Sequence, residues 1–314
     1  PSRGFFSFPR KTCIMEANGV EEVGTLQWTD RDEKIWAEIL AWEERYFQYE
    51  SNDLTFTYER WVEAGFNKLS DPLQARVLNT IDTLLFHLHA LIQNSQFQLE
   101  AKQRLLNEAR LFDKTIDEIS DLKQLEIDQL RYITGQHIAR QRLLSFAQGG
   151  LTGTGGFFLL GIDFPAVITM NLRAIQLIAL NYGYEVGMPG EMMTALKVFH
   201  SASLPKRLRH EAWMSLEDEV FKRKYDPYFY EDDQILVDSL WFEHTLKHLA
   251  KSVVIQLLRK KVVQGVPLLG MAFGAGVNYQ FSRQVTEMAH HFYQKRHLYE
   301  KREMVEDFHD SSRT

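Results

Sequence analysis

LLSFAQGGLTGTGGFFLLGIDFPAVITMNLRAIQLIALNYGY, residues 143–184, is the stretch that decides the fold of this chain. Its first twenty residues, 143–162, carry no charge and contain six glycines, and the apolar character then continues with interruptions at Asp163 and Arg173. Residues 262–282, VVQGVPLLGMAFGAGVNYQFS, form a shorter uncharged counterpart. Glycines three or four positions apart allow helix backbones to approach closely. The two segments are therefore predicted to form two glycine-rich apolar helical hairpins at the core of the protein.

Helical periodicity dominates the rest of the chain. Apolar residues recur at steps of three and four, the spacing of one helix face, and the clearest case follows the helix-start signal Ser70-Asp71-Pro72. Further helices are expected at about 32–40, 99–112, 114–133, 192–199, 233–261 and 283–298. The charged segment 203–232 is expected to be a surface excursion. Because no segment alternates with the period-two pattern of a strand, the predicted fold is all-α, a multi-helix bundle around the two hairpins.

A single helical domain is expected over residues 31–305, between a flexible leader at 1–30 and a tail at 306–314. The leader begins with proline and reaches its first methionine at Met15, so part of it is expected to be non-native. It contains no apolar run of signal-peptide length. The one cysteine, Cys13, excludes an internal disulfide and a cysteine-rich metal site. These features predict a cytoplasmic protein.

Composition and motifs argue against nucleic-acid and nucleotide binding. The formal net charge is −6, whereas nucleic-acid binding requires a basic face that displaces counterions. Gly150 and Gly155 match G-x-x-x-x-G, but Gly156 and Phe157 follow where a phosphate-binding loop needs Lys and Ser or Thr. The dinucleotide pattern would need glycine at Phe158. Neither nucleic acid as a partner nor any cofactor is predicted.

The uncharged segments have two interpretations. About twenty apolar residues can span a bilayer, but an Asp or Arg at the centre of a span costs about 2.5–3.5 kcal/mol. The segments are therefore expected either to pack tightly in the core or to associate reversibly with a membrane. The basic cluster 259–261 suits either an anionic leaflet or the solvated C-terminus of a helix. The predicted membrane or partner contacts are Gly153, Gly156, Phe157, Phe158, Arg259, Lys260, Lys261 and Phe273.

Candidate catalytic residues lie where the two hairpins would meet. These are Asp163, Arg173, Arg283 and His291. Asp163 comes two residues before Pro165 and is also typical of a helix cap. Arg173 lies in an apolar helix, where a buried guanidinium needs a partner such as Asp163 or Glu287.

A metal site is not predicted. His244 and His248 are four residues apart on an expected helix, which places both side chains on one face. The sequence between them, HTLKH, lacks the glutamate of H-E-x-x-H. They are the weak candidates for metal ligands.

The two uncharged segments resemble those of the EcsC family, which is named after the third product of a bacterial ABC-transporter operon. The resemblance rests on Asp163-Phe164-Pro165, Asn171-Leu172-Arg173, Tyr182-Gly183 and the block 267–279, within signature segments 143–188 and 259–300. It implies an EcsC-like domain and a Bacillus-like bacterial cell. It also implies a partner such as membrane lipid or a membrane protein, for example an ABC transporter component. It implies no particular activity and no catalytic residues.

Three functions are compatible with these features. The first is a non-enzymatic accessory protein, peripheral to the inner face of the cytoplasmic membrane and linked to an ABC transporter system. The second is a hydrolase or metal-dependent enzyme with its site at the junction of the two hairpins. The third is a protein that binds a small apolar ligand or lipid between them. The sequence sets no oligomeric state.

Overall fold

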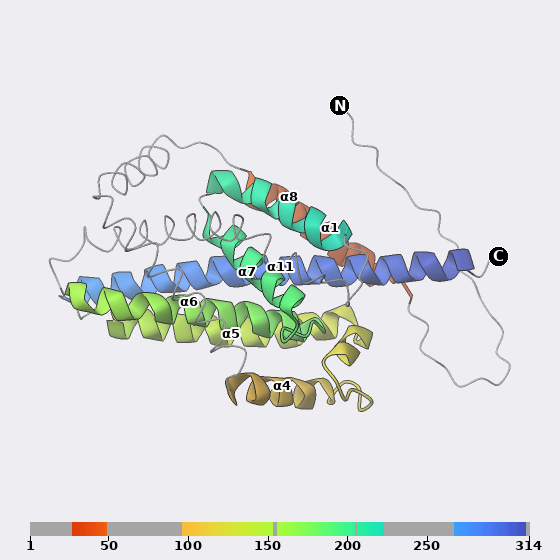
Figure 1. Ribbon diagram of the computed structural model, residues 1–314, viewed down its shortest axis with the longest axis horizontal. Helices are drawn as coiled ribbons and strands as arrows, with labels where there is room; N and C mark the ends of the chain where they lie inside the picture. The colour runs from red at the N-terminus through yellow and green to blue at the C-terminus, as the bar shows by residue number, and fades with distance from the viewer. Residues whose placement is uncertain (1–26, 49–95, 153–155, 205, 223–266, 312–314) are drawn as a thin grey trace.

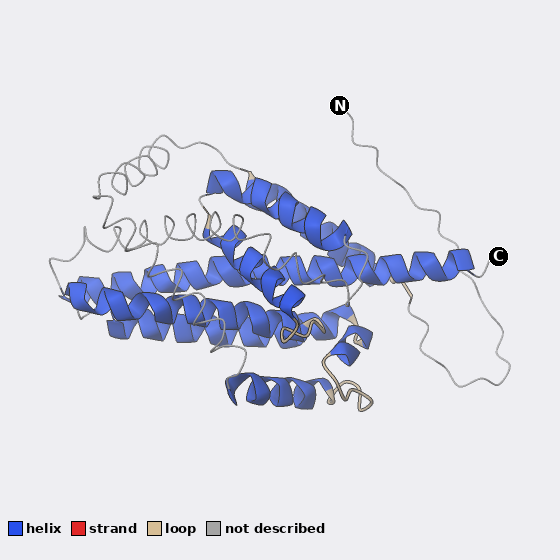
Figure 2. Ribbon diagram, viewed as in Figure 1, coloured by secondary structure: helices blue, strands red, loops and turns tan. Residues whose placement is uncertain are grey.

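A computed structural model describes residues 27–48, 96–152, 156–204, 206–222 and 267–311. Within these ranges every regular element is helical and no strand occurs, which confirms the predicted all-α class (Figure 2). The elements are α1 (Asp30–Phe47), α4 (Gln96–Ala109), the short 3-10 helix η1 (Ser120–Gln124), α5 (Ile127–Thr152), α6 (Gly156–Asn181), α7 (Pro189–Ser203), α8 (Lys206–Lys222) and α11 (Pro267–Ser311).

Three long helices form the body of the molecule. α5, α6 and α11 pack side by side along the long axis, and α7 lies across them (Figure 1). α1 and α8 lie above α11 in this view, and α4 lies below α5. The last turn of α5 and the first turns of α6 and α11 all lie at the same end of the bundle. The two segments without charge are therefore brought together in space.

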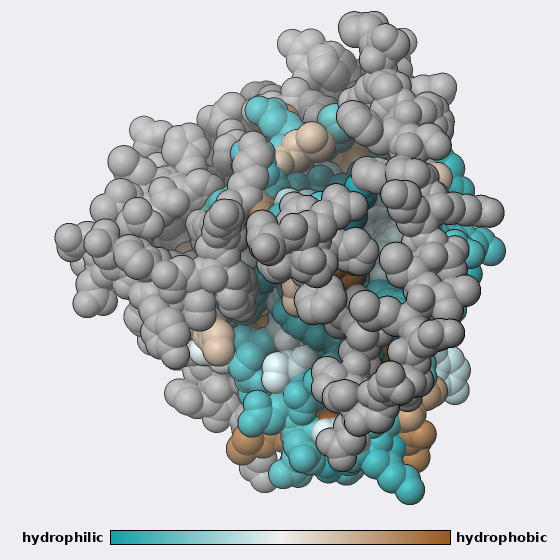
Figure 3. Space-filling model, turned by 90° about the vertical axis from the view of Figure 1, so that its right-hand side faces the viewer, coloured by the Kyte–Doolittle hydropathy of each residue, from teal (hydrophilic) through white to brown (hydrophobic). Residues whose placement is uncertain are grey.

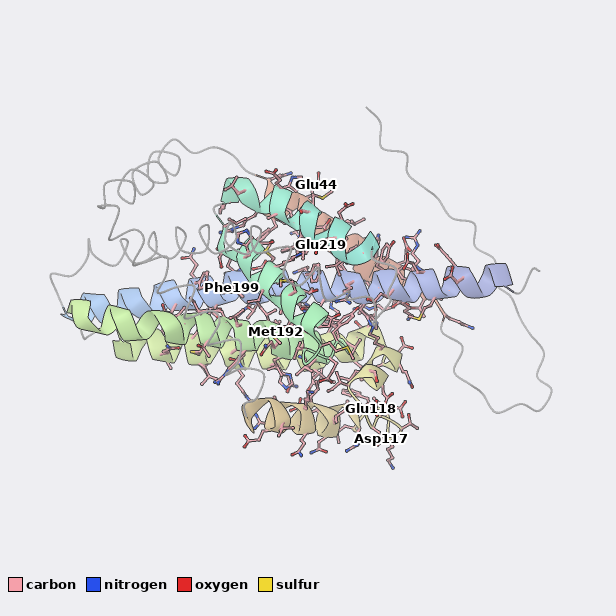
Figure 4. All side chains as sticks on the ribbon, in the orientation of Figure 1. Glu44, Asp117, Glu118, Met192, Phe199 and Glu219 are labelled. Atoms are coloured by element: carbon pink, nitrogen blue, oxygen red, sulfur yellow. The ribbon has the colours of Figure 1, made fainter. Side chains whose placement is uncertain are left out.

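The core surrounds the middle of α11. The fully buried apolar residues of this helix are Val285, Met288, Ala289, Phe292, Tyr293 and Leu298, spaced by one, three or five. α7 covers the long helices with Met192 and Phe199, and Figure 4 shows side chains filling the space beneath it. Every residue from 292 to 298 is buried. Since this run includes charged residues, α11 has to find ionic partners inside the protein.

Helix starts and stops follow local chemistry. At the start of α1, Thr29 Oγ1 accepts a hydrogen bond from the Asp32 amide at 3.1 Å, and Asp32 Oδ2 accepts one from the Thr29 amide at 2.9 Å. This reciprocal arrangement satisfies two amides that helix geometry leaves free. Asp32 is buried, and its Oδ2 also accepts a hydrogen bond from Lys301 Nζ of α11 at 2.8 Å. The cap thereby fixes α1 against α11.

Several expected boundaries are wrong. α6 runs continuously through Asp163 and Pro165, so Asp163 does not cap a helix that begins at Pro165. α11 is one helix of 45 residues from Pro267, so no new helix begins near Arg283. Of the expected helix 114–133, only the part from Ile127 is α-helical. Helices are stabilised mainly by tertiary packing, which overrides a single proline or glycine signal.

The charged segment after α7 also differs from the expectation. Residues Lys206–Lys222 form α8, and its Trp213 and Leu216 are buried, so this part is not a surface excursion. The sequence did not indicate a buried helix here, because the two buried apolar residues lie just three positions apart and many of the neighbouring residues are charged. The described residues do not establish the two glycine-rich hairpins, because the connection 153–155 and residues 262–266 lie outside them.

Candidate functional site

The apolar end comprises residues 143–152 of α5, 156–162 of α6 and 267–282 of α11. None of these residues is charged. Large apolar side chains on its described part are open to solvent, with exposed fractions of 66% for Leu143, 49% for Leu144, 50% for Phe146 and 39% for Tyr279. The rings of Phe146 and Tyr279 meet edge to face, with centroids 6.3 Å apart, and join α5 to α11. Among the described helices, none has both the length and the apolar character to cross a bilayer.

Arginines border the apolar end. Arg142 immediately precedes it on α5, and Arg283 immediately follows it on α11. Arg142 Nε donates to Thr286 Oγ1 at 2.9 Å, and its Nη2 donates to the Arg283 carbonyl oxygen at 3.4 Å. Burial lowers the pKa of Arg142, and the nearby positive charge of Arg283 lowers it further. Arg140, two residues earlier on α5, is exposed.

Glu287 connects two of the four predicted catalytic residues. Arg283 Nε lies 3.8 Å from Glu287 Oε2, and His291 Nδ1 lies 2.8 Å from the Glu287 carbonyl oxygen. Trp42 Nε1 donates to Glu287 Oε1 at 3.0 Å. The His291 ring stacks on Trp42 with centroids 3.9 Å apart, and burial lowers the pKa of His291 to about 4. His291 is therefore neutral at pH 7 and held by packing.

The other predicted site residues are placed less fully. Arg173 lies partly buried on α6, and Asp163 lies on the same helix, with its side chain outside the described part. Gly156, Phe157 and Phe158 belong to α6 and Phe273 to α11, all at the apolar end, and their side chains also lie outside it. Gly153, His244, His248, Arg259, Lys260 and Lys261 fall outside the described residues altogether. Their expected roles stay predictions.

A charged belt around α11 is the feature that the sequence did not predict. It consists of Glu43, Glu191, Glu217, Lys295, Arg296 and Glu300. Lys295 Nζ bonds Glu43 Oε1 at 2.6 Å and Glu217 Oε1 at 2.5 Å, which joins α1 and α8 to α11. Burial raises the pKa of Glu217 to about 7, with the charge of Glu43 adding to the rise and that of Lys295 opposing it. One lysine thus bridges two carboxylates that would otherwise only repel each other.

The remaining residues of the belt, Glu191, Arg296 and Glu300, attach α7 to α11. Arg296 Nη1 and Nη2 donate to the two carboxylate oxygens of Glu191 at 2.8 and 2.7 Å, and Arg296 Nε donates to Glu300 Oε1 at 2.9 Å. The guanidinium lies 4.0 Å from the centroid of the Tyr184 ring. A buried arginine that is paired with two carboxylates in this way fixes helix positions, and its charge is compensated inside the protein. We interpret the belt as structural. Among the described residues, no cluster of His, Cys, Asp or Glu could hold a metal ion.

Comparison with known proteins gives a consistent family match. A model of the EcsC protein family matches residues 33–298. The Bacillus subtilis (strain 168) protein YdbA, described as uncharacterized, is 25% identical over 259 residues, which cover 78% of this chain and 86% of YdbA. Protein EcsC of the same organism is 24% identical over 180 residues, covering 57% of this chain and 69% of EcsC. No solved structure matches the chain.

Proposed function

The chain belongs to the EcsC protein family, and from this premise we propose that it is an accessory protein that docks reversibly on the cytoplasmic face of a membrane through its apolar end. The observation that carries the proposal is the exposure of Leu143, Leu144 and Phe146 beside three uncharged helix ends. Burying one such side chain completely contributes about 1.5–3 kcal/mol. Three half-exposed side chains therefore contribute about 2–4.5 kcal/mol toward binding.

The length of the apolar end suits shallow docking. At a rise of about 1.5 Å per residue, residues 143–152 extend about 15 Å, and half of the hydrocarbon core of a bilayer is also about 15 Å thick. Helix ends leave backbone amides and carbonyls unpaired, and such groups are costly in lipid. Contact with the outer part of one leaflet is therefore favoured over deep insertion.

The proposal is tested by flotation of the purified protein with vesicles of phosphatidylcholine and phosphatidylglycerol. We expect the wild-type protein to float and the variant Leu143→Ser/Leu144→Ser/Phe146→Ser to lose about tenfold or more in partitioning, because at least 1.4 kcal/mol of apolar burial is removed. The matched control is Leu99→Ser/Met214→Ser/Met304→Ser, which removes similarly exposed apolar residues away from the apolar end. Equal flotation of the two variants, or no flotation of the wild type, contradicts the proposal.

The link to an ABC transporter enters this proposal as an expectation from the family resemblance. It predicts that the protein cross-links to a transporter subunit when a photoreactive residue replaces Leu143 in cells. A cross-link only to lipid would restrict the function to membrane docking.

A further inference from the structure

We infer that Arg142 and Arg283 form a binding site for the phosphate of an anionic phospholipid headgroup, at the border of the apolar end between α5 and α11. The inference deepens the proposed function and rests on it, because the lipid reaches this site only when the apolar end is docked. It adds the chemical class of lipid and the residues that recognise it.

The first argument is the proximity of two cations. Arg142 is anchored by Thr286 Oγ1 at 2.9 Å and by the Arg283 carbonyl oxygen at 3.4 Å, so its guanidinium lies against the turn of α11 that carries Arg283. The Arg283 side chain is 61% exposed. Two guanidinium groups placed together repel each other, and an anion between them converts this repulsion into attraction.

The second argument is the balance of charge around the pair. Glu287 is the acidic residue that faces both arginines, and it also accepts the Trp42 indole N–H at 3.0 Å. Its Oε2 remains 3.8 Å from Arg283 Nε, longer than a direct hydrogen bond. Towards the apolar end, residues 129–162 and 267–286 contain no Asp or Glu. Among the residues that the structure describes, the pair therefore keeps a net positive charge, to which the exposed Arg140 adds.

The third argument is position along the two helices. Arg142 precedes the exposed Leu143, and Arg283 follows Ser282, the last residue of the uncharged segment of α11. Both guanidinium groups thus stand where apolar surface gives way to polar surface, at the depth of lipid phosphates in a docked protein. The exposed Tyr279 and Phe146 lie beside them, and tyrosine is enriched at this level of a bilayer. Arginine suits phosphate because its planar fork donates two parallel hydrogen bonds.

The test measures binding of the full chain to two kinds of vesicle, one of phosphatidylcholine alone and one also containing phosphatidylglycerol. We expect the wild type to prefer the anionic vesicles, and Arg142→Gln/Arg283→Gln to lose roughly tenfold to thirtyfold on them, since each basic residue at the surface contributes about 1 kcal/mol. Binding to phosphatidylcholine should change little. The matched control is Arg131→Gln/Arg302→Gln, which removes the same charge from arginines paired with Glu38 and Glu306.

Further measurements separate the alternatives. Arg283→Gln alone changes an exposed side chain, so it keeps the test valid if the double variant fails to fold. Arg142→Lys/Arg283→Lys keeps the charge and should restore only part of the preference. An equal loss in the control variant, or wild-type binding that ignores phosphatidylglycerol, overturns the phosphate site while the proposed docking stands. Displacement of the protein from anionic vesicles by glycerol phosphate would assign the site to a soluble phosphate and overturn the lipid assignment. No vesicle binding at all refutes the proposed function itself.

Discussion

Gly183 ends α6 in a conformation that other residues rarely adopt. Its φ is +80°, its N–H donates to the Leu180 carbonyl at 3.0 Å, and the Tyr184 N–H donates to the Ala179 carbonyl at 3.0 Å. This pair of bonds is a Schellman motif, in which glycine is favoured because it lacks a Cβ. The sequence identified Tyr182-Gly183 as part of the family pattern. The physical reason for the glycine appears only with the backbone geometry and the packing of Lys123.

Replacing Gly183 with alanine is expected to destabilise the protein by about 2–5 kcal/mol, the sum of a left-handed conformation at about 1–2 kcal/mol and overpacking at about 1–3 kcal/mol. A Cβ at this position would lie 2.6 Å from Lys123 Cγ and 3.3 Å from the Ile119 carbonyl oxygen. Urea unfolding followed by circular dichroism measures the change. As a control, Gly135→Ala meets no atom within 4 Å in α5 and should stabilise by about 0.5–1 kcal/mol. Equal stabilities of the two variants would refute the account.

Among the elements, α11 decides how the other helices assemble. The sequence predicted a helix over 283–298 but assigned the preceding uncharged residues to a glycine-rich hairpin, so it missed the single helix from Pro267. Residues 268–314 contain no proline, which was the available signal for a longer helix. The charged belt was not predictable from local pattern, because Lys295 lies 252 residues from Glu43 and 78 from Glu217. Only the packing of α1 and α8 on α11 brings these charges together.

The contact of Lys295 with Glu43 and Glu217 predicts that the stability of the protein depends on pH. The pKa of Glu217 is raised from 4.5 to about 7, so the folded protein holds the proton of this carboxyl more tightly than the unfolded chain does. The stabilisation that results from this difference is fully present below pH 4.5 and is lost as the pH rises to about 7. We therefore expect Glu217→Gln to gain up to about 3 kcal/mol in stability relative to the wild type between pH 5 and pH 8. Urea unfolding of both proteins across this range measures the difference.

Glu211→Gln is the control for this prediction, since Glu211 is an exposed carboxylate on the same helix. Its stability should run parallel to that of the wild type at every pH. Parallel curves for Glu217→Gln as well would mean that Glu217 is ionised throughout this range and that its burial is unimportant.

On the scale of the whole molecule, the described helices form a bundle with two chemically different ends. Figure 3 views the end where α11 finishes, and the described surface there is largely hydrophilic, with smaller hydrophobic areas at its lower edge. The uncharged ends of α5, α6 and α11 lie at the opposite end. Hydropathy along the sequence revealed both uncharged segments and the all-α class. It did not reveal that Arg142 and Arg283 lie together, because that depends on how α5 and α11 pack.

Buried histidines set the acid stability of this assembly. Burial lowers the pKa of His290 to about 3 and those of His291 and His297 to about 4, so all three are neutral in the folded protein at pH 5. His290 Nδ1 lies 3.2 Å from the Tyr182 hydroxyl, and His291 stacks on Trp42. Unfolding would expose them to water, where an ordinary histidine binds a proton below pH 6.5.

The protein is therefore expected to lose stability as the pH falls from 6.5 to 5. A histidine with a lowered folded pKa contributes stability above its unfolded pKa that is lost on acidification, and three such groups outweigh the opposite effect of Glu217. The net uptake of two protons on unfolding corresponds to about 2–3 kcal/mol per pH unit. Urea unfolding measured across this range gives the slope of the free energy of unfolding against pH. We expect His297→Gln to reduce this slope by about half. The control His210→Gln changes an exposed histidine of α8 and should leave the slope unchanged. A slope that is flat in the wild type would show that these imidazoles take up protons without unfolding.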